Sequence, residues 1–294
     1  MNLPDKPTGG LRAPFVAPGW DLGGRTLKPA GRPLVMGIVN LTPDSFYAGS
    51  RPAGCGPAVE LALRLQAEGA DILDLGAESS RPGAEPVDQA EELDRLLPVL
   101  EALRAETSLP VTVDTVRAGT ARAALDAGAD GINDISAGQH DLEMIPLAAD
   151  HRCGLVLMHM RGIPRTMQDS PTYTDVVAEV AGWLAARCRL ALDQGVAPER
   201  LLVDPGIGFG KTRDHNLALL GHLKAVAGGR PLLLGASRKR FIGEITGAAV
   251  EDRLPGSLAA LHCAWQGGAS VVRVHDVKES VQYLEVLKAV AAQP

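Results

Sequence analysis

Short apolar runs recur eight times along the chain, and a segment with apolar residues at helical spacing follows each of them. The runs cover residues 34–40, 72–78, 111–115, 131–135, 154–160, 201–205, 232–236 and 271–275. Continuous apolar runs of this length are typical of strands that are covered on both faces. Eight alternating strand–helix units predict an α/β protein with the (β/α)8, or TIM, barrel fold.

Polar residues fall mainly at the ends of these runs. They are Asn40, Asp114, Asn133, Asp204, Ser237, Arg273 and His275, with Lys239 just beyond the seventh run. In a (β/α)8 barrel the active site is built at the carboxyl ends of the strands. We therefore expect these side chains, although far apart in sequence, to form one site.

The chain outside the strand–helix units predicts a tail, a hairpin and two loops. Residues 1–19 are rich in Pro and Gly and lack periodicity, which predicts a flexible tail. Residues 20–33 predict a short hairpin that plugs the bottom of the barrel, with a simple loop as the alternative interpretation. No change in composition marks a second domain, so residues 20–294 are expected to form a single domain. Loops 41–56 and 79–88 are long and rich in Gly, Pro and Ser, and we expect them to be mobile on the site face.

Composition narrows the class of protein. At 294 residues and 46% hydrophobic content, the chain is near the usual size of one such barrel and has enough apolar residues for a large core. A net charge of −6 argues against nucleic-acid binding, which needs a basic face. The absence of a membrane-length apolar run and of a leader pattern predicts a cytoplasmic protein without membrane contact. The four cysteines are scattered, which favours reduced thiols over disulfides or a zinc site.

Seven segments resemble the dihydropteroate synthase family. They are MGIVNLTPDSF (36–46), DILDLGAESSRPGA (71–84), GINDISA (131–137), LMHMRGIPRTMQ (157–168), DPGIGFGKT (204–212), GASRKRFIG (235–243) and VRVHDV (272–277). The resemblance implies an enzyme of folate biosynthesis that joins 6-hydroxymethyl-7,8-dihydropterin pyrophosphate to p-aminobenzoate and releases pyrophosphate. It also implies a Mg2+ cofactor, a homodimer and a target of sulfonamides.

A pterin presents a flat edge of N–H, amino and carbonyl groups, and buried carboxylates and amides are suited to bind it. Asp114, Asn133 and Asp204 end three of the strands, and the resemblance assigns all three to the pterin together with Lys239. Charge-assisted bonds to such an edge contribute about 1.5–3 kcal/mol each. The pyrophosphate needs cations and donors. The resemblance assigns Asn40, Arg273 and His275 to it, with Asn40 also reaching Mg2+.

The p-aminobenzoate needs an apolar slot and a partner for its carboxylate. The resemblance implies Phe46, Pro82 and Phe209 as walls, with Ser80, Arg81, Lys239 and Ser237 nearby, and adds Met158 and Gly235 to the substrate contacts. The chain departs from the commonest family pattern at Tyr47–Ala48 and at Ser80, both next to this slot. The implied catalysis is electrostatic. Asp114 and Asp204 stabilise a pterin cation, while Lys239, Arg273, His275 and Mg2+ bind or stabilise the charged groups around it.

Two other functions fit part of the pattern. A methyltetrahydrofolate-binding methyltransferase would share Asp114, Asn133 and Asp204 but has no use for Arg81, Lys239 or the Arg273–His275 pair. A non-catalytic pterin-binding protein would not need the two long loops. A nucleotide P-loop at GKT is excluded, because three residues separate Gly206 from Gly210 where a P-loop has four between its outer glycines.

Overall fold

The eight predicted strands form one parallel barrel. The computed structural model describes residues 15–41, 55–78, 87–163 and 165–293. The strands are β3 (Leu34–Asn40), β4 (Ile72–Gly76), β5 (Val111–Asp114), β6 (Gly131–Asp134), β7 (Gly154–Met158), β8 (Leu201–Asp204), β9 (Leu233–Leu234) and β10 (Val271–Val274). Their order in the sheet is β8-β7-β6-β5-β4-β3-β10-β9. A parallel bridge between Val203 and Leu232 joins β8 to the segment of β9 and closes the barrel. The predicted fold is therefore confirmed.

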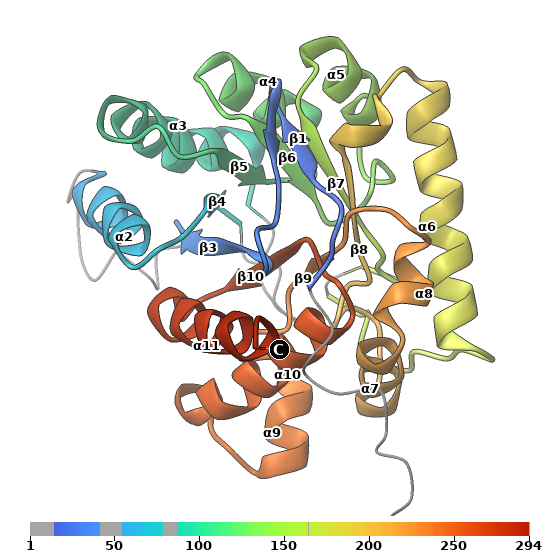
Figure 1. Ribbon diagram of the computed structural model, residues 1–294. Helices are drawn as coiled ribbons and strands as arrows, with labels where there is room; N and C mark the ends of the chain where they lie inside the picture. Colours follow the sequence, from blue (N-terminus) through green and yellow to red (C-terminus); the bar gives the residue numbers. More distant parts are fainter. Residues whose placement is uncertain (1–14, 42–54, 79–86, 164, 294) are drawn as a thin grey trace, which may run out of the picture.

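Helices follow every strand of the barrel and surround it (Figure 1). They are α2 (Gly56–Ala67), α3 (Gln89–Glu106), α4 (Ala118–Asp126), α5 (Met144–His151), α6 (Val176–Asp193), α7 (Arg213–Gly221), α8 (Leu223–Ala227), α9 (Arg240–Thr246), α10 (Leu254–Gln266) and α11 (Val277–Ala291). Side chains define several starts: Asp88 caps α3, Asp175 caps α6 and Thr212 caps α7 by accepting backbone N–H bonds. In the described part of the chain, no helix is long and apolar enough to cross a membrane.

The predicted hairpin is present and fills the amino-terminal end of the barrel. Strands β1 (Trp20–Leu22) and β2 (Arg25–Leu27) pair antiparallel, and β1 lies against β7 and β8 (Figure 1). Trp20 and Leu22 are fully buried in a cluster with the first inward-facing residues of the strands. Gly131 and Gly154 make room for them, because a Cβ at either position would lie within 2.6 Å of a Leu22 methyl group. The hairpin thus closes the bottom of the barrel, as predicted.

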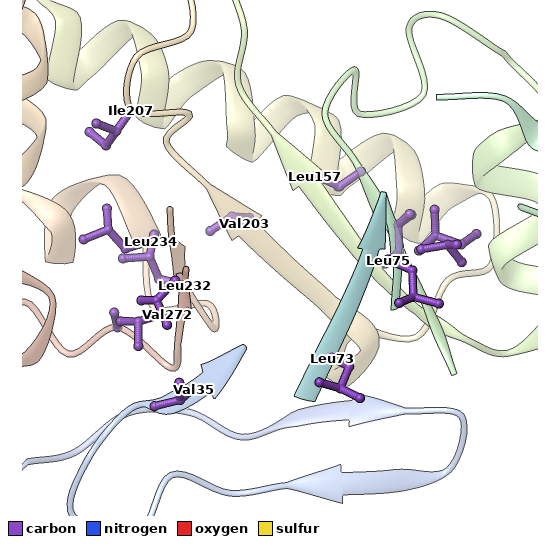
Figure 2. Packing of buried hydrophobic residues seen from close by; sticks show 14 of the residues in the cluster. Val35, Leu73, Leu75, Leu157, Val203, Ile207, Leu232, Leu234 and Val272 are labelled. Atoms are coloured by element: carbon purple, nitrogen blue, oxygen red, sulfur yellow. The ribbon is translucent and has the colours of Figure 1, made fainter. Parts of the chain in front are cut away.

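Side chains on the strands alternate between two environments. Outward-facing residues such as Val35, Leu73 and Val272 pack in the main core beneath the helices (Figure 2). Inward-facing residues are apolar at the start of a strand and polar near its end. Ile72 is followed on the same face by Asp74, Leu202 by Asp204, and Val271 by Arg273. On these three strands the interior changes from apolar to charged over one inward-facing step, which places the charged groups near the carboxyl ends of the strands.

Part of the sequence interpretation lies outside the described residues. Residues 1–14 of the expected tail are among these, while Phe15 stacks on Trp265 of α10 with ring centroids 6.2 Å apart. Most of the loops 41–56 and 79–88 is also outside the described residues, so their expected mobility stays a prediction.

Candidate active site

Three charged side chains from β4, β5 and β10 form the centre of the polar end. The Arg273 guanidinium donates from Nε to Asp74 Oδ2 at 2.6 Å and from Nη2 to Asp114 Oδ2 at 2.8 Å. All three side chains project inward, because each lies two residues beyond an inward-facing residue of the same strand. These residues are Ile72, Thr112 and Val271. One cation is thus held between two carboxylates at the floor of the polar end.

Asp74 organises this floor and was given no role by the sequence interpretation. Its side chain is fully buried and accepts hydrogen bonds from Thr112 Oγ1 at 2.5 Å and Asn133 Nδ2 at 3.0 Å, besides the bond from Arg273. It therefore orients both an expected pterin residue, Asn133, and an expected anion residue, Arg273. The sequence feature that could have identified Asp74 is the alternation of side chains along a strand, which places Asp74 on the same face as Ile72.

The two carboxylates expected to bind the pterin have raised pKa values. Burial raises the pKa of Asp114 to about 7, although the nearby Arg273 guanidinium lowers it. Burial also raises the pKa of Asp204 to about 6, and a hydrogen bond from the Gly206 N–H to Oδ1 at 2.7 Å opposes that rise. Both groups titrate near neutrality, where carboxylates placed in a cleft are suited to charge-dependent recognition.

An apolar wall with one cation stands beside Asp204. The Lys239 ammonium lies 4.0 Å from the centroid of the Phe209 ring. Phe209 packs with Met158, Ile135 and Met167 in a small buried cluster on this side. Gly235 lies next to the same pocket, since a Cβ there would be 3.9 Å from Asp204 Oδ2 and from Arg273 Cβ. The structure thus brings Met158, Phe209, Gly235 and Lys239 near Asp204 and Arg273.

Two of the residues expected to bind an anion lie together at the ends of β3 and β10. Asn40 and His275 line one open cavity between β3, β10 and α2. His275 Nδ1 lies 3.1 Å from Ser237 Oγ, and the His275 N–H donates to the same oxygen at 3.3 Å. Burial, together with the nearby Arg273 charge, lowers the pKa of His275 to about 4. The imidazole is therefore neutral near pH 7, so its ring N–H is available as a hydrogen-bond donor and the ring carries no positive charge.

Lys211 of the GKT segment is buried beside the apolar wall. Its ammonium lies 3.0 Å from His159 Nδ1 and donates to the carbonyl oxygens of His159 and Phe209 at 3.2 and 3.0 Å. Thr212 does not face a phosphate site, since its hydroxyl caps α7. The exclusion of a P-loop agrees with this arrangement. No role was predicted for Lys211 from the sequence, and nothing in its spacing indicates burial.

The remaining predicted residues lie outside the described part of the chain. These are Phe46, Ser80, Arg81 and Pro82. Within the described residues no group of three or more His, Cys, Asp or Glu side chains is placed to hold a metal ion. Asn40 therefore offers a single amide oxygen, which suits Mg2+ only if substrate oxygens and waters complete the coordination.

Comparison with known proteins places this geometry in a family. The pattern of the family described as "Pterin binding enzyme" matches residues 36–275. The chain belongs to this family. Within it, the chain is 44% identical over 269 residues to dihydropteroate synthase of Synechocystis sp., covering 90% of this chain and 93% of the relative. It is 43% identical to the dihydropteroate synthase of Escherichia coli over 87% of this chain and 91% of that one. The chain therefore belongs with the dihydropteroate synthases.

Solved structures of pterin-binding family members match over nearly the whole chain. Xanthomonas albilineans dihydropteroate synthase with 4-aminobenzoic acid has a TM-score of 0.88 and 48% identity, covering 95% of this chain and all of that one. Burkholderia cenocepacia dihydropteroate synthase complexed with 7,8-dihydropteroate has a TM-score of 0.85 and 45% identity, covering 95% of this chain and 98% of that one. The predicted family is thus confirmed at the level of sequence and of structure.

Proposed function

We propose that the protein is a dihydropteroate synthase, a transferase that joins 6-hydroxymethyl-7,8-dihydropterin pyrophosphate to p-aminobenzoate and releases pyrophosphate. The observation that carries the proposal is full-length similarity to dihydropteroate synthases, including structures with 4-aminobenzoic acid and with 7,8-dihydropteroate. The charged layer at the carboxyl ends of the strands supports it, because carboxylates, an amide and cations meet there at one end of one barrel.

The pterin is proposed to lie over the floor formed by Asp74, Asp114 and Arg273. Asp204 and Asn133 face this pocket from β8 and β6, and their oxygens are acceptors for the N–H and amino groups of a pterin edge. Asp204 and Asp114 are needed as carboxylates, since a charge-assisted bond is roughly twice as strong as a neutral one. Lys239 supplies a donor on the side of Phe209, where the pterin carbonyl and the arylamine slot are expected to meet.

The reaction needs stabilisation of separating charges more than it needs a base. An arylamine is uncharged at neutral pH, so its nitrogen can attack without prior removal of a proton. When the carbon–oxygen bond to pyrophosphate breaks, positive charge develops on the pterin and negative charge on the leaving group. Asp114 and Asp204 are proposed to stabilise the first, and Arg273, His275 and Asn40 the second. Charged groups that are already oriented before the reaction are the most effective at stabilising the charges that develop.

Mg2+ is part of this proposal. Mg2+ usually keeps several waters and binds through one or two protein oxygens together with substrate phosphates. The Asn40 amide lies at the cavity that His275 also lines, so it could hold such an ion beside the pyrophosphate. When bound, the ion would neutralise charge on the leaving group. Isothermal titration of Mg2+ with and without pyrophosphate tests the role of Asn40, because Asn40→Ala should weaken only the pyrophosphate-dependent binding.

A turnover assay decides between the three functions. Purified protein is mixed with the pterin pyrophosphate and p-aminobenzoate, and both dihydropteroate and pyrophosphate are measured. Equal amounts of the two products are expected. Pterin binding without turnover would support the non-catalytic protein, and methyl transfer from methyltetrahydrofolate would support the methyltransferase. A sulfonamide should compete with p-aminobenzoate, as the Yersinia pestis relative's structure with a sulfonamide drug leads us to propose.

Two further expectations remain part of the proposal. The homodimer implied by the family resemblance is tested by sedimentation velocity of the purified chain, where a single monomer boundary at micromolar concentration would contradict it. The cytoplasmic location predicted from the sequence is tested by fractionation of the source cells. Neither expectation affects the assignment of the reaction.

A further inference from the structure

Lys211 is a buried lysine beside the pterin pocket, and the proposed reaction gives it no role. Its side chain is 3% exposed and follows the glycine-rich turn after β8. The three polar atoms it contacts are His159 Nδ1, the His159 carbonyl and the Phe209 carbonyl, none of which is a carboxylate. A buried ammonium without a contacting carboxylate costs free energy and needs a reason for its position.

Its contacts join two parts of the pocket wall. The Phe209 carbonyl is held by Lys211, while the ring of the same residue carries the Lys239 ammonium. On the other side, His159 packs edge-on against Trp183 of α6, with centroids 4.9 Å apart. Lys211 thus ties the end of β7 to the turn that carries Phe209. The turn is seated closely on β7, since a Cβ at Gly206 would overlap the His159 carbonyl oxygen.

Charges around the pocket give Lys211 a second effect. Besides burial and the hydrogen bond from the Gly206 N–H, the main influences on the pKa of Asp204 are the charges of Lys239, Lys211 and Arg273, which are all cationic. Those that act on Lys211 are Asp204, Lys239 and Arg161, besides the contacting His159. The His215 imidazole also feels the Lys211 charge. Asp204 is the carboxylate among these groups that favours the charged form of Lys211, so the two groups stabilise each other's ionised forms.

We propose that Lys211 is a positioning residue of the pterin site, whose buried ammonium holds the Phe209 turn and keeps the Asp204 carboxylate ionised. The proposal rests on the proposed function only in taking Asp204 as a pterin ligand. Lys211 touches no substrate and acts through Phe209 and Asp204. Replacing it removes a charge, three hydrogen bonds, or both, and these losses have different signatures.

The protonation states are consistent with this role. Burial lowers the pKa of Lys211 to about 7, and burial lowers the pKa of His159 to about 3. His159 is therefore neutral and accepts through Nδ1. The Asp204 charge raises the pKa of Lys211 against the effect of burial, and the Lys211 charge lowers the pKa of Asp204, so each charged form favours the other. Removal of that positive charge raises the pKa of Asp204 further, so a smaller fraction of Asp204 is ionised at a given pH.

The test compares Lys211→Gln, which keeps a donor but loses the charge, with Lys211→Arg, which keeps the charge. Lys224→Gln, an exposed lysine on α8, is the matched control. The first measurement follows the Asp204 carboxylate by 13C NMR in the free protein, with Asp204→Asn identifying its resonance. We expect its pKa to rise by about one unit in the Gln variant, equivalent to roughly tenfold in its ionisation constant. The Arg variant and the control should match the wild type. Unchanged titration in the Gln variant would overturn the charge role.

The second measurement is pterin affinity as a function of pH, without the arylamine. Wild-type affinity should fall as pH falls through the pKa of Asp204, and in Lys211→Gln the fall should begin at higher pH while affinity at alkaline pH changes less than about threefold. A uniform loss at all pH values would show a merely structural residue. If wild type binds no pterin, the proposed function fails, but the NMR result still decides the inference. Thermal melting of each variant verifies folding. If Lys211→Gln does not fold, Lys211→Met takes its place in both measurements. Loss of folding in both neutral variants, but not in Lys211→Arg, would contradict a role confined to the site.

Discussion

The two ends of the barrel interior are built from opposite kinds of side chain. At the amino-terminal end, Trp20 and Leu22 of the hairpin pack with Leu34, Ile72 and Val271 in a fully apolar layer. At the carboxyl end, further along the inward faces of the strands, charged side chains replace them, such as Asp74 after Ile72 and Arg273 after Val271. The first layer removes apolar surface from water and stabilises the fold. The second keeps charges out of water, which costs free energy and is explained by binding.

This contrast predicts that the two layers can be damaged separately. A change in the apolar layer should reduce the free energy of unfolding and leave ligand affinity nearly unchanged. A change in the charged layer should reduce ligand affinity and leave the free energy of unfolding unchanged or higher, because natural sites commonly retain groups that are unfavourable for stability.

The largest effect is expected for Trp20→Ala. The Trp20 ring is fully buried and its Nε1 donates to the Arg200 carbonyl at 2.8 Å. Truncating a buried tryptophan costs about 3–5 kcal/mol. Denaturant unfolding measures the loss, with Leu217→Ala on the exposed face of α7 as the control. Pterin affinity of the folded variant should stay within about threefold of wild type, a change below 1 kcal/mol. A large loss of affinity would show that the two layers are coupled.

Asp204→Asn tests the opposite end. The amide can still accept from the Gly206 N–H but has no charge, so we expect pterin affinity to fall by about 1.5–3 kcal/mol, or roughly 10–150-fold. The free energy of unfolding at pH 8 should be unchanged or higher. Calorimetric titration with a pterin gives the affinity, and the exposed Asp214→Asn is the control. Wild-type affinity in Asp204→Asn would remove Asp204 from the pterin site.

Asp114 should affect stability in a way that depends on pH. Burial raises the pKa of Asp114 to about 7, so between about pH 4 and pH 7 the folded protein holds a proton that the unfolded chain releases. This group's contribution to stability is therefore lost as pH rises through that range. Asp114→Asn, which imitates the protonated form, should be more stable than wild type at pH 8 by on the order of 1 kcal/mol and equal to it near pH 4. Unfolding curves at the two pH values check the sign, and a pH-independent difference would contradict it.

The smallest effect is expected at the boundary between the layers. Thr112 is fully buried and donates to Asp74 at 2.5 Å. Thr112→Val keeps the shape and removes the donor, which should cost about 1 kcal/mol of stability and weaken pterin binding by a few-fold through Asp74. Chemical unfolding and titration of one preparation measure both. If stability falls but pterin affinity does not, Thr112 belongs to the apolar layer and Asp74 does not orient the site.

The sequence predicted the strands because both of their faces are covered, so each appears as an uninterrupted apolar run. It found Asp114, Asn133, Asp204 and Arg273 for the same reason, since each interrupts such a run at its end. Asp74 was given no role because it stands inside a run, where only the alternation of faces separates an inward position from an outward one. That assignment needs the register between neighbouring strands.

Other parts of the site could not be read from the chain. The burial of Lys211 depends on how the turn after β8 packs against the end of β7, and no periodicity records such a contact. The engagement of Arg273 with two carboxylates depends on three strands distant in sequence. The assignments of Phe46, Ser80, Arg81 and Pro82 rest on family resemblance alone and stay predictions.

The closure of the barrel has a consequence for its motions. Strand β9 has two residues, and a bridge between Val203 and Leu232 joins its segment to β8. Backbone amides along this seam should exchange with solvent deuterium faster than those of the longer pairs on β3 and β4, because local opening there breaks few hydrogen bonds. Asp204 stands on one side of the seam and Lys239 follows the other. A ligand held by both would span the seam, so substrate occupancy should be visible as slowed deuterium uptake in residues 201–206 and 232–237.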